Sequence, residues 1–167
     1  MGKDIDGGLM PLFRELYQRS RYREFTLDEK YLHGMFCQIA FANAHRAADG
    51  AMQVFVAEGE QGIEGFVMVA CERLYHVGVQ LMVSDLYFYV REGADPHAAG
   101  GLWNAVEEWA NAPGVVKLWP GVSNALTENY ERTALFFKRR GYRMRGLMLE
   151  KDLTYTKEAV ERPRSAA

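Results

Sequence analysis

The stretch of sequence that decides the fold is SDLYFYVREGADPHAAGGLWNAVEEWA, residues 84–110. Its first part is rich in aromatic and β-branched residues and predicts a strand, and its last part has the apolar spacing of an amphipathic helix. Between them, Asp95 and Pro96 fit the N-cap and first residue of a helix over residues 96–110. A strand, a small-residue loop and a helix N-terminus form a general anion site, because the first-turn amides have no partner within the helix. The same small residues also suit close packing of a helix on a sheet, and this stretch alone leaves both interpretations open.

Apolar spacing and turn residues elsewhere predict the remaining elements. Two further helices are expected over residues 9–19 and 127–140, and another is expected to begin after a capping box formed by Thr26 and Glu29. Strands are expected over residues 52–58, 63–72, 79–90, 115–119 and 142–153. This order predicts an α/β protein of the layered α+β kind, with a mixed, mostly antiparallel central sheet flanked by helices. A single domain is expected over residues 1–153, followed by a polar C-terminal tail over residues 154–167.

Composition and charge exclude several classes of protein. The 167 residues are 49% hydrophobic and 25% charged, which is typical of one globular domain. The net charge is −2 and basic residues form no stripe, so no nucleic-acid partner is expected. No apolar run has membrane-spanning length and no signal peptide is visible, which predicts a cytoplasmic protein without a membrane partner. Cys37 and Cys71 are expected to be buried free thiols, and neither they nor the histidines have metal-binding spacing.

Five segments of the chain carry a resemblance to a known family: SRYREFTLDE, IEGFVMV, DLYFYV followed by a helix with EEWA, VVKLWPGVSN, and ERTALFFKRRGYRMRG. Over residues 15–153 the chain resembles the GNAT-type N-acetyltransferases, in particular the small ones often encoded by phages and prophages. The resemblance implies acetyl-CoA as co-substrate and an amine as acceptor, with the pantetheine arm in a gap between residues 86–90 and 117–122. Pro120 and Gly121 suit such a gap and equally suit an ordinary edge turn. The CoA-binding residues that the resemblance implies are Tyr89, Val90, His97, Ala98, Ala99, Gly100, Gly101 and Asn124.

The chain departs from the family pattern at two places. The family's pyrophosphate motif, Arg or Gln, two residues, Gly, one residue, then Gly or Ala, falls on Ala94, His97 and Ala99, of which only Ala99 fits. The Tyr that the family commonly uses as general acid falls on Phe137, which has no proton to give. Tyr130, two turns earlier, is the candidate replacement.

The predicted strand over residues 79–90 carries the candidate catalytic groups. Simple alternation puts an acid and two phenols on one face, together with Leu81 and Val83: Asp85, Tyr87 and Tyr89. A carboxylate near a thioester can take the proton that an amine must lose before it attacks. Asp85 is therefore the candidate base, and Tyr87 or Tyr89 a candidate acid. In the alternative interpretation Asp85 bonds a neighbouring backbone group or an Arg, and the tyrosines pack with hydrated hydroxyls.

The basic residues around the last predicted helix also allow two interpretations. They suit the 3′-phosphate end of CoA, and they equally suit a solvated helix C-terminus: Arg132, Lys138, Arg139 and Arg140.

Three functions remain compatible with the sequence. The first is an acyl-CoA-dependent N-acyltransferase, and the second a catalytically silent GNAT-fold module that binds a protein or metabolite. The third is a phage structural or host-interaction protein that keeps only the scaffold. The interrupted strand favours the first, whereas the incomplete motif and Phe137 favour the second. We prefer acyl transfer, and an oligomer is compatible with any of the three.

Overall fold

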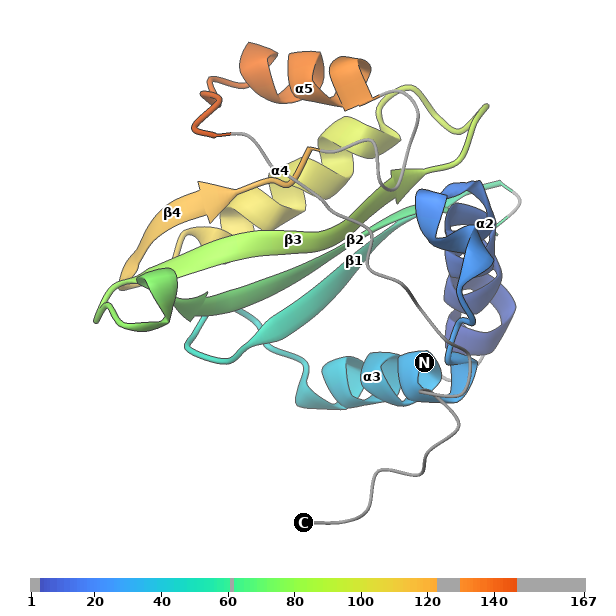
Figure 1. Ribbon diagram of the computed structural model, residues 1–167, viewed down its shortest axis with the longest axis horizontal. Helices are drawn as coiled ribbons and strands as arrows, with labels where there is room; N and C mark the ends of the chain where they lie inside the picture. Colours follow the sequence, from blue (N-terminus) through green and yellow to red (C-terminus); the bar gives the residue numbers. More distant parts are fainter. Residues whose placement is uncertain (1–3, 61, 123–129, 147–167) are drawn as a thin grey trace.

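A four-stranded sheet forms the middle layer of the protein, with helices on both of its faces (Figure 1). The computed structural model describes residues 4–60, 62–122 and 130–146. In chain order the described elements are η1 (Ile5–Leu9), α2 (Met10–Arg19), η2 (Arg21–Glu24), α3 (Glu29–Ala42), β1 (Met52–Gly59), β2 (Gly62–Arg73), η3 (Leu74–His76), β3 (Leu81–Val90), α4 (Ala98–Ala110), β4 (Val115–Trp119) and α5 (Tyr130–Arg139). The predicted layered α/β fold is confirmed.

The strands lie in the order β1-β2-β3-β4. The β1–β2 and β2–β3 pairs are antiparallel, and β3–β4 is parallel. A parallel pair needs a crossover connection, and α4 provides it. The sheet is thus mixed and mostly antiparallel, as its sequence predicts.

Side chains of β2 divide the interior into two hydrophobic cores. Phe66 and Met68 pack on one face with α2 and α3, and Val67 and Val69 pack on the other with α4 and α5. All four are fully buried. A strand buried on both faces is apolar without interruption, and this explains the run FVMV in the sequence.

Helix starts differ from those predicted because other side chains act as caps. The side chain of Asp28, not that of Thr26, caps α3 by accepting from the Tyr31 amide at 2.9 Å. Glu29 is released from the predicted capping box and forms an ion pair with Arg14 at 2.7 Å. Tertiary pairing between α2 and α3 has therefore overridden the local motif.

Two further expectations need correction. Cys71 is buried, but Cys37 is exposed, because the apolar stripe of α3 turns the side chain of Cys37 away from the core. Residues 142–146 of the expected last strand are not in a strand, and residues 147–153 lie outside the described part. Among the described helices, none has the length and apolar character needed to cross a bilayer.

Candidate active site at the β3–β4 fork

A β-bulge divides β3 into two halves. Met68 pairs with Tyr87 and Val69 pairs with Asp85, so Leu86 has no partner on β2. An extra residue on one strand reverses the alternation of side chains beyond it. Tyr87 and Tyr89 consequently contact the α2/α3 core, whereas Leu81 and Val83 contact the α4/α5 core. The expectation that Asp85 shares one face with both tyrosines is therefore wrong.

The two parallel strands separate directly before this bulge. Pairing of β3 with β4 begins at Leu81 with Val115 and ends at Ser84 with Trp119. The next residue of that segment is Pro120, which has no amide to donate to a ladder. Figure 1 shows β3 running on well beyond the end of β4. Among the residues that the structure describes, the second half of β3 pairs with β2 on one side and with no strand on the side of β4; we name this opening the fork.

Asp85 lies at the point where the fork begins. One carboxylate oxygen accepts a hydrogen bond from the amide of Gly121, across the fork. The side chain is half-buried, and burial raises the pKa of Asp85 to about 6, although hydrogen bonds from the Gly121 amide and its own amide act in the opposite direction. Such a carboxylate is ionised but readily protonated near neutral pH, as a general base must be. Its base role stays a prediction, and the backbone partner that the alternative interpretation predicted is present.

The N-terminus of α4 offers only part of its amides to a ligand. The amide of Asp95 donates to Glu64 at 3.1 Å, and the amide of His97 donates to the Asp95 carboxylate at 2.6 Å. The amides of Ala99 and Gly100 have no acceptor within the described part of the chain. Two amides therefore remain for an anion, and the chain's own carboxylates occupy two others.

The glycines of this helix do not serve close packing. A methyl group added at Gly100 or Gly101 would meet nothing within 4 Å. The close-packing interpretation of these two small residues is thus wrong, and the surface above them is open. An α4 that begins at Ala98 rather than at Pro96 places both glycines in its first turn.

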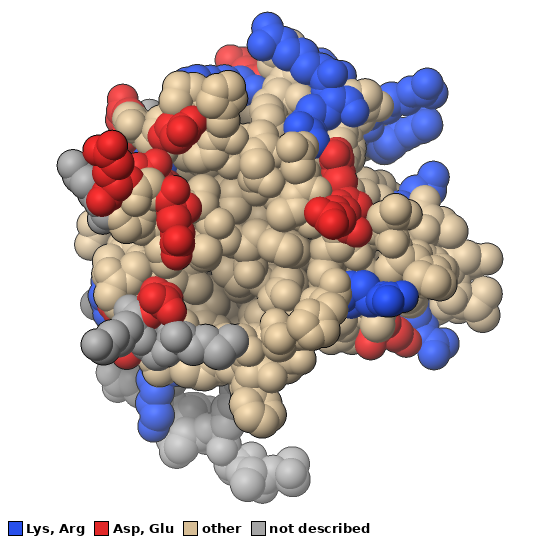
Figure 2. All heavy atoms as spheres, turned by 180° about the vertical axis from the view of Figure 1, so that it is seen from behind, with Lys and Arg blue, Asp and Glu red and all other residues tan. Residues whose placement is uncertain are grey.

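A pocket of about 340 Å³ lies on the β1 side of α4. Its apolar wall includes Phe55 and Leu102, and its polar wall includes Glu58, Glu64 and Asp95. Seen from behind, the molecule has acidic side chains gathered on one side of a hollowed surface, while Lys and Arg gather at another edge (Figure 2). His97, Ala98 and Gly101 of the predicted phosphate loop also line this pocket, but its three carboxylates repel phosphate. A pyrophosphate bound at the α4 N-terminus would therefore have to lie toward the amides of Ala99 and Gly100, away from Glu58, Glu64 and Asp95.

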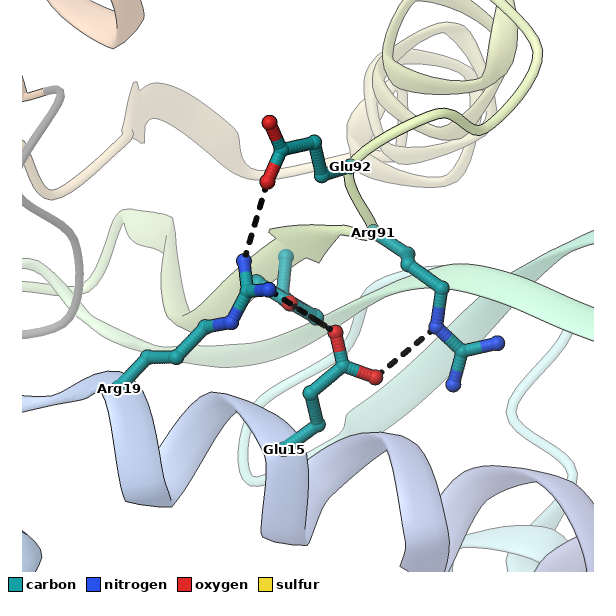
Figure 3. A network of polar contacts seen from close by, with 5 residues as sticks. Glu15, Arg19, Arg91 and Glu92 are labelled. Atoms are coloured by element: carbon teal, nitrogen blue, oxygen red, sulfur yellow. Dashed lines mark hydrogen bonds and ion pairs between the residues drawn. The ribbon is translucent and has the colours of Figure 1, made fainter.

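A polar network joins α2 to the end of β3, and Figure 3 shows Glu15 of α2 facing Arg91. The hydroxyl of Tyr89 belongs to this network: it donates to Glu15 at 2.7 Å, and Arg91 donates to the other oxygen of Glu15 at 2.9 Å. Burial, followed by the bond to Glu15, raises the pKa of Tyr89 to about 12. Burial also acts to raise the pKa of Glu15, but the bonds from Tyr89 and Arg91 outweigh it and hold that pKa below its ordinary value. The hydroxyl of Tyr89 therefore fastens α2 to the sheet.

Tyr87 lies on the same side of the sheet, among other aromatic residues. Its ring meets that of Phe13 edge to face, with centroids 4.8 Å apart. Burial raises its pKa, and the neighbouring phenols of Tyr17 and Tyr22 add to the effect. Tyr87 and Asp85 are close in sequence, but the bulge turns them toward opposite faces.

The α5 side of the fork holds the other predicted residues. Phe137 is a core residue, 3% exposed, with its ring 4.7 Å from that of Trp103. Tyr130, at the start of α5, is 41% exposed, and Asn124 lies outside the described residues. Arg140 donates to Asn104 and Glu107, each at 2.6 Å, so it joins α5 to α4. The three other basic residues of this group are exposed: Arg132, Lys138 and Arg139.

Sequence reasoning missed the contacts that hold this site together. Glu15 binds Tyr89, and Glu64 binds the amide of Asp95, the predicted N-cap, each from a distant part of the chain. Gly121, which the sequence placed only at the expected gap, binds Asp85. No motif marks them, because each acts through a single oxygen or amide brought close by the fold. The described residues contain no group of His, Cys, Asp and Glu that would hold a metal ion.

Several solved structures with a similar architecture are described as acetyltransferases. Glucosamine-6-phosphate N-acetyltransferase from Arabidopsis thaliana is 14% identical, with a TM-score of 0.65 over 92% of this chain and 95% of that chain. A GNAT family acetyltransferase of Staphylococcus aureus is 14% identical, with a TM-score of 0.57 over 90% and 92%. This chain has the GNAT fold.

A further solved structure agrees on the fold. Ribosomal-protein-alanine N-acetyltransferase from Brucella melitensis has a TM-score of 0.61 at 12% identity, over 90% of this chain and 94% of that chain. No protein-family model matches the sequence, and the search of curated proteins finds no match. The separation of β3 from its parallel neighbour is the gap that the resemblance in sequence led us to expect between residues 86–90 and 117–122.

Proposed function

We propose that this protein is an acyl-CoA-dependent N-acyltransferase that transfers an acyl group to an amine of a small molecule or protein. The proposed acyl group is acetyl. The observation that carries the proposal is the fork: β3 loses its parallel partner after Ser84, and a carboxylate with a raised pKa lies where the strands separate. Solved structures of similar fold, described as acetyltransferases, support the same reaction class. The proposed partners are a CoA thioester and an amine, in the cytoplasm.

The residues present fit CoA in two respects. The unpaired edge of β3 between Asp85 and Val90 offers backbone groups to an extended pantetheine arm, as a neighbouring strand would. The open amides of Ala99 and Gly100 suit a pyrophosphate, because unpaired first-turn amides and the helix dipole attract anions. We propose that Tyr89, Val90, His97, Ala98, Gly101 and Asn124 complete the surroundings of the cofactor.

Acetyl-CoA supplies an acyl group activated as a thioester. Asp85 would take the proton from the attacking amine, directly or through a water molecule. Gly121 would hold the carboxylate in place through the hydrogen bond across the fork. Tyr130 or Tyr87 would supply a proton to the leaving group; Phe137 supplies none, and a thiolate leaves without much assistance near neutral pH.

One observation favours a second candidate, a GNAT-fold module that binds without catalysis. The carboxylates of Glu64 and Asp95 take two of the amides next to the predicted phosphate site. Like charges near a pyrophosphate weaken its binding. A protein that recognises a different ligand in the same cleft would have no need for open amides there.

Thermal unfolding with and without acetyl-CoA tests the first requirement. A ligand that binds only the folded protein stabilises it by about 2.7 kcal/mol at a concentration of one hundred times Kd. We expect a rise in Tm with acetyl-CoA and release of free thiol when an accepted amine is added. A rise in Tm without thiol release across a broad panel of amines would show CoA binding without transfer to those amines. No rise would contradict acyl transfer from CoA and favour the module that binds a different ligand.

A further inference from the structure

The outer side of α3 carries a nucleophile, a base and an acid in contact with one another. Sγ of Cys37 lies 3.7 Å from Nδ1 of His33, and Nε2 of the same ring lies 2.9 Å from a carboxylate oxygen of Asp6. Cys37 and His33 are four residues apart on one helix, which makes them neighbours on its surface. Asp6 comes from η1, so the chain of three groups exists only in the folded protein.

The proton positions among Asp6, His33 and Cys37 follow from the chemistry of the three side chains. A carboxylate only accepts hydrogen bonds, so Nε2 of the ring carries a hydrogen and donates it to Asp6. In the neutral ring Nδ1 is then the acceptor, and it faces the thiol. A nucleophile beside a base that is itself oriented by a third group is the general arrangement of an activated nucleophile.

The thiol of Cys37 is open to reagents. Cys37 is exposed, and so is Phe41, one helical turn further on, at 92%. The ring of Phe41 offers apolar surface next to the sulfur. The charged groups nearby on the same helix are Lys30 and Glu29, and Glu29 is neutralised by its ion pair with Arg14.

We propose that Cys37 is an activated surface thiol and a modification site that forms mixed disulfides with low-molecular-weight disulfides. The proton of the thiol passes to Nδ1 of His33, and Asp6 stabilises the imidazolium that results. The Cys37 sulfur attacks one sulfur of the disulfide, a new S–S bond forms, and the old one breaks. The departing thiolate takes up a proton and leaves as a free thiol, so one disulfide is exchanged for another.

The second cysteine is a built-in control. Cys71 is 1% exposed, and burial, with smaller contributions from Asp49 and Glu72, raises the pKa of its thiol. Both effects oppose reaction, because the thiolate is the nucleophile and must be accessible. The protein should therefore present one fast thiol and one slow thiol.

The test is the rate of reaction with 5,5′-dithiobis(2-nitrobenzoate) near pH 7, with the modified peptide identified by mass. We expect the fast phase to map to Cys37 and to disappear in Cys37→Ser. In His33→Gln the fast rate should fall by at least about tenfold, less than the roughly 10² to 10⁴ typical of a positioned base because this site is exposed, and in Asp6→Asn it should fall less. Lys30→Gln, the matched control, should stay within about twofold, since exposed charges interact weakly.

Unfolding curves show whether each variant is still folded. We expect all of them to fold, because the substituted side chains are at the surface. A fast phase in His33→Gln within about twofold of the unsubstituted rate would overturn the proposal, because general-base help is at least an order of magnitude where it operates. A fast phase that maps to Cys71 would overturn it as well. Neither result bears on acyl transfer, so the two proposals stand or fall separately.

Discussion

The two halves of β3 differ in what they do, although they belong to one strand. From Leu81 to Ser84 the strand is paired on both sides, and Val83 is fully buried. From Asp85 onward the described strands pair with it on one side only, and Leu86 is 41% exposed. The first half holds the sheet together, and the second half offers backbone edge and a titratable group. A functional site in this fold therefore arises where regular pairing ends.

The largest difference between the halves is expected in stability. Val83→Asp buries a charge without a partner and should lower the free energy of unfolding by at least about 3 kcal/mol. Leu86→Asp places the same side chain at the exposed bulge position and should cost less than about 1 kcal/mol. Urea denaturation of the two variants measures both values. Equal losses would mean that the bulge is as tightly packed as the paired half.

Asp85→Asn sharpens the comparison by separating charge from shape. An amide oxygen can still accept from the Gly121 amide, so the fork should keep its geometry. The amide has no basicity, and acyl transfer should fall by more than about tenfold while CoA affinity stays within about twofold. Steady-state kinetics and calorimetry give the two numbers. If the variant instead loses several kcal/mol of stability with its activity, Asp85 is a structural partner of Gly121 and not the base.

The pH dependence of activity and stability should run in opposite directions. The folded-state pKa of Asp85, about 6, is above its ordinary value of 3.8, so ionisation is disfavoured by folding. Below about pH 4 Asp85 is neutral in both states; between about pH 4 and 6 the unfolded chain ionises first, so the Asp85 contribution to stability falls and then levels off above about pH 6. Activity should rise around pH 6, because only the carboxylate accepts a proton. Profiles of kcat/KM and Tm check this, and the part of each trend that is due to Asp85 should vanish in Asp85→Asn.

The smallest effect is expected at the helix that follows β3. Gly100→Val should fold, since nothing lies within 4 Å of an added Cβ, and it should weaken CoA binding about tenfold by keeping the pyrophosphate from the backbone. Gly34→Val in α3 is the matched control, because its Cβ would also meet nothing within 4 Å and it lies outside the fork. Calorimetric titration with CoA compares them. Equal affinities in the two variants would place the pyrophosphate elsewhere.

Prediction from sequence succeeded where side-chain periodicity is local. The bounds of β4 and the C-terminal end of α4 agree with the structure, because short apolar runs and flanking turn residues set them. Prediction failed for the sheet face on which the side chains of Tyr87 and Tyr89 lie. A bulge depends on how β3 pairs with β2, and the alternation of residue types along the sequence does not reveal it. It also failed at the start of α3, where Arg14 of a different helix recruited Glu29.

By itself the sequence determined the layered α/β fold and the presence of a strand, a small-residue loop and a helix in that order. Periodicity and turn chemistry suffice for this, because each segment's apolar face must be buried against another. The tertiary structure alone decided which distant groups meet: Asp85 with Gly121, Tyr89 with Glu15, and His33 with Asp6. Such contacts join residues far apart in the chain or on different elements, and their geometry is fixed only when the sheet, its bulge and its helices have packed together.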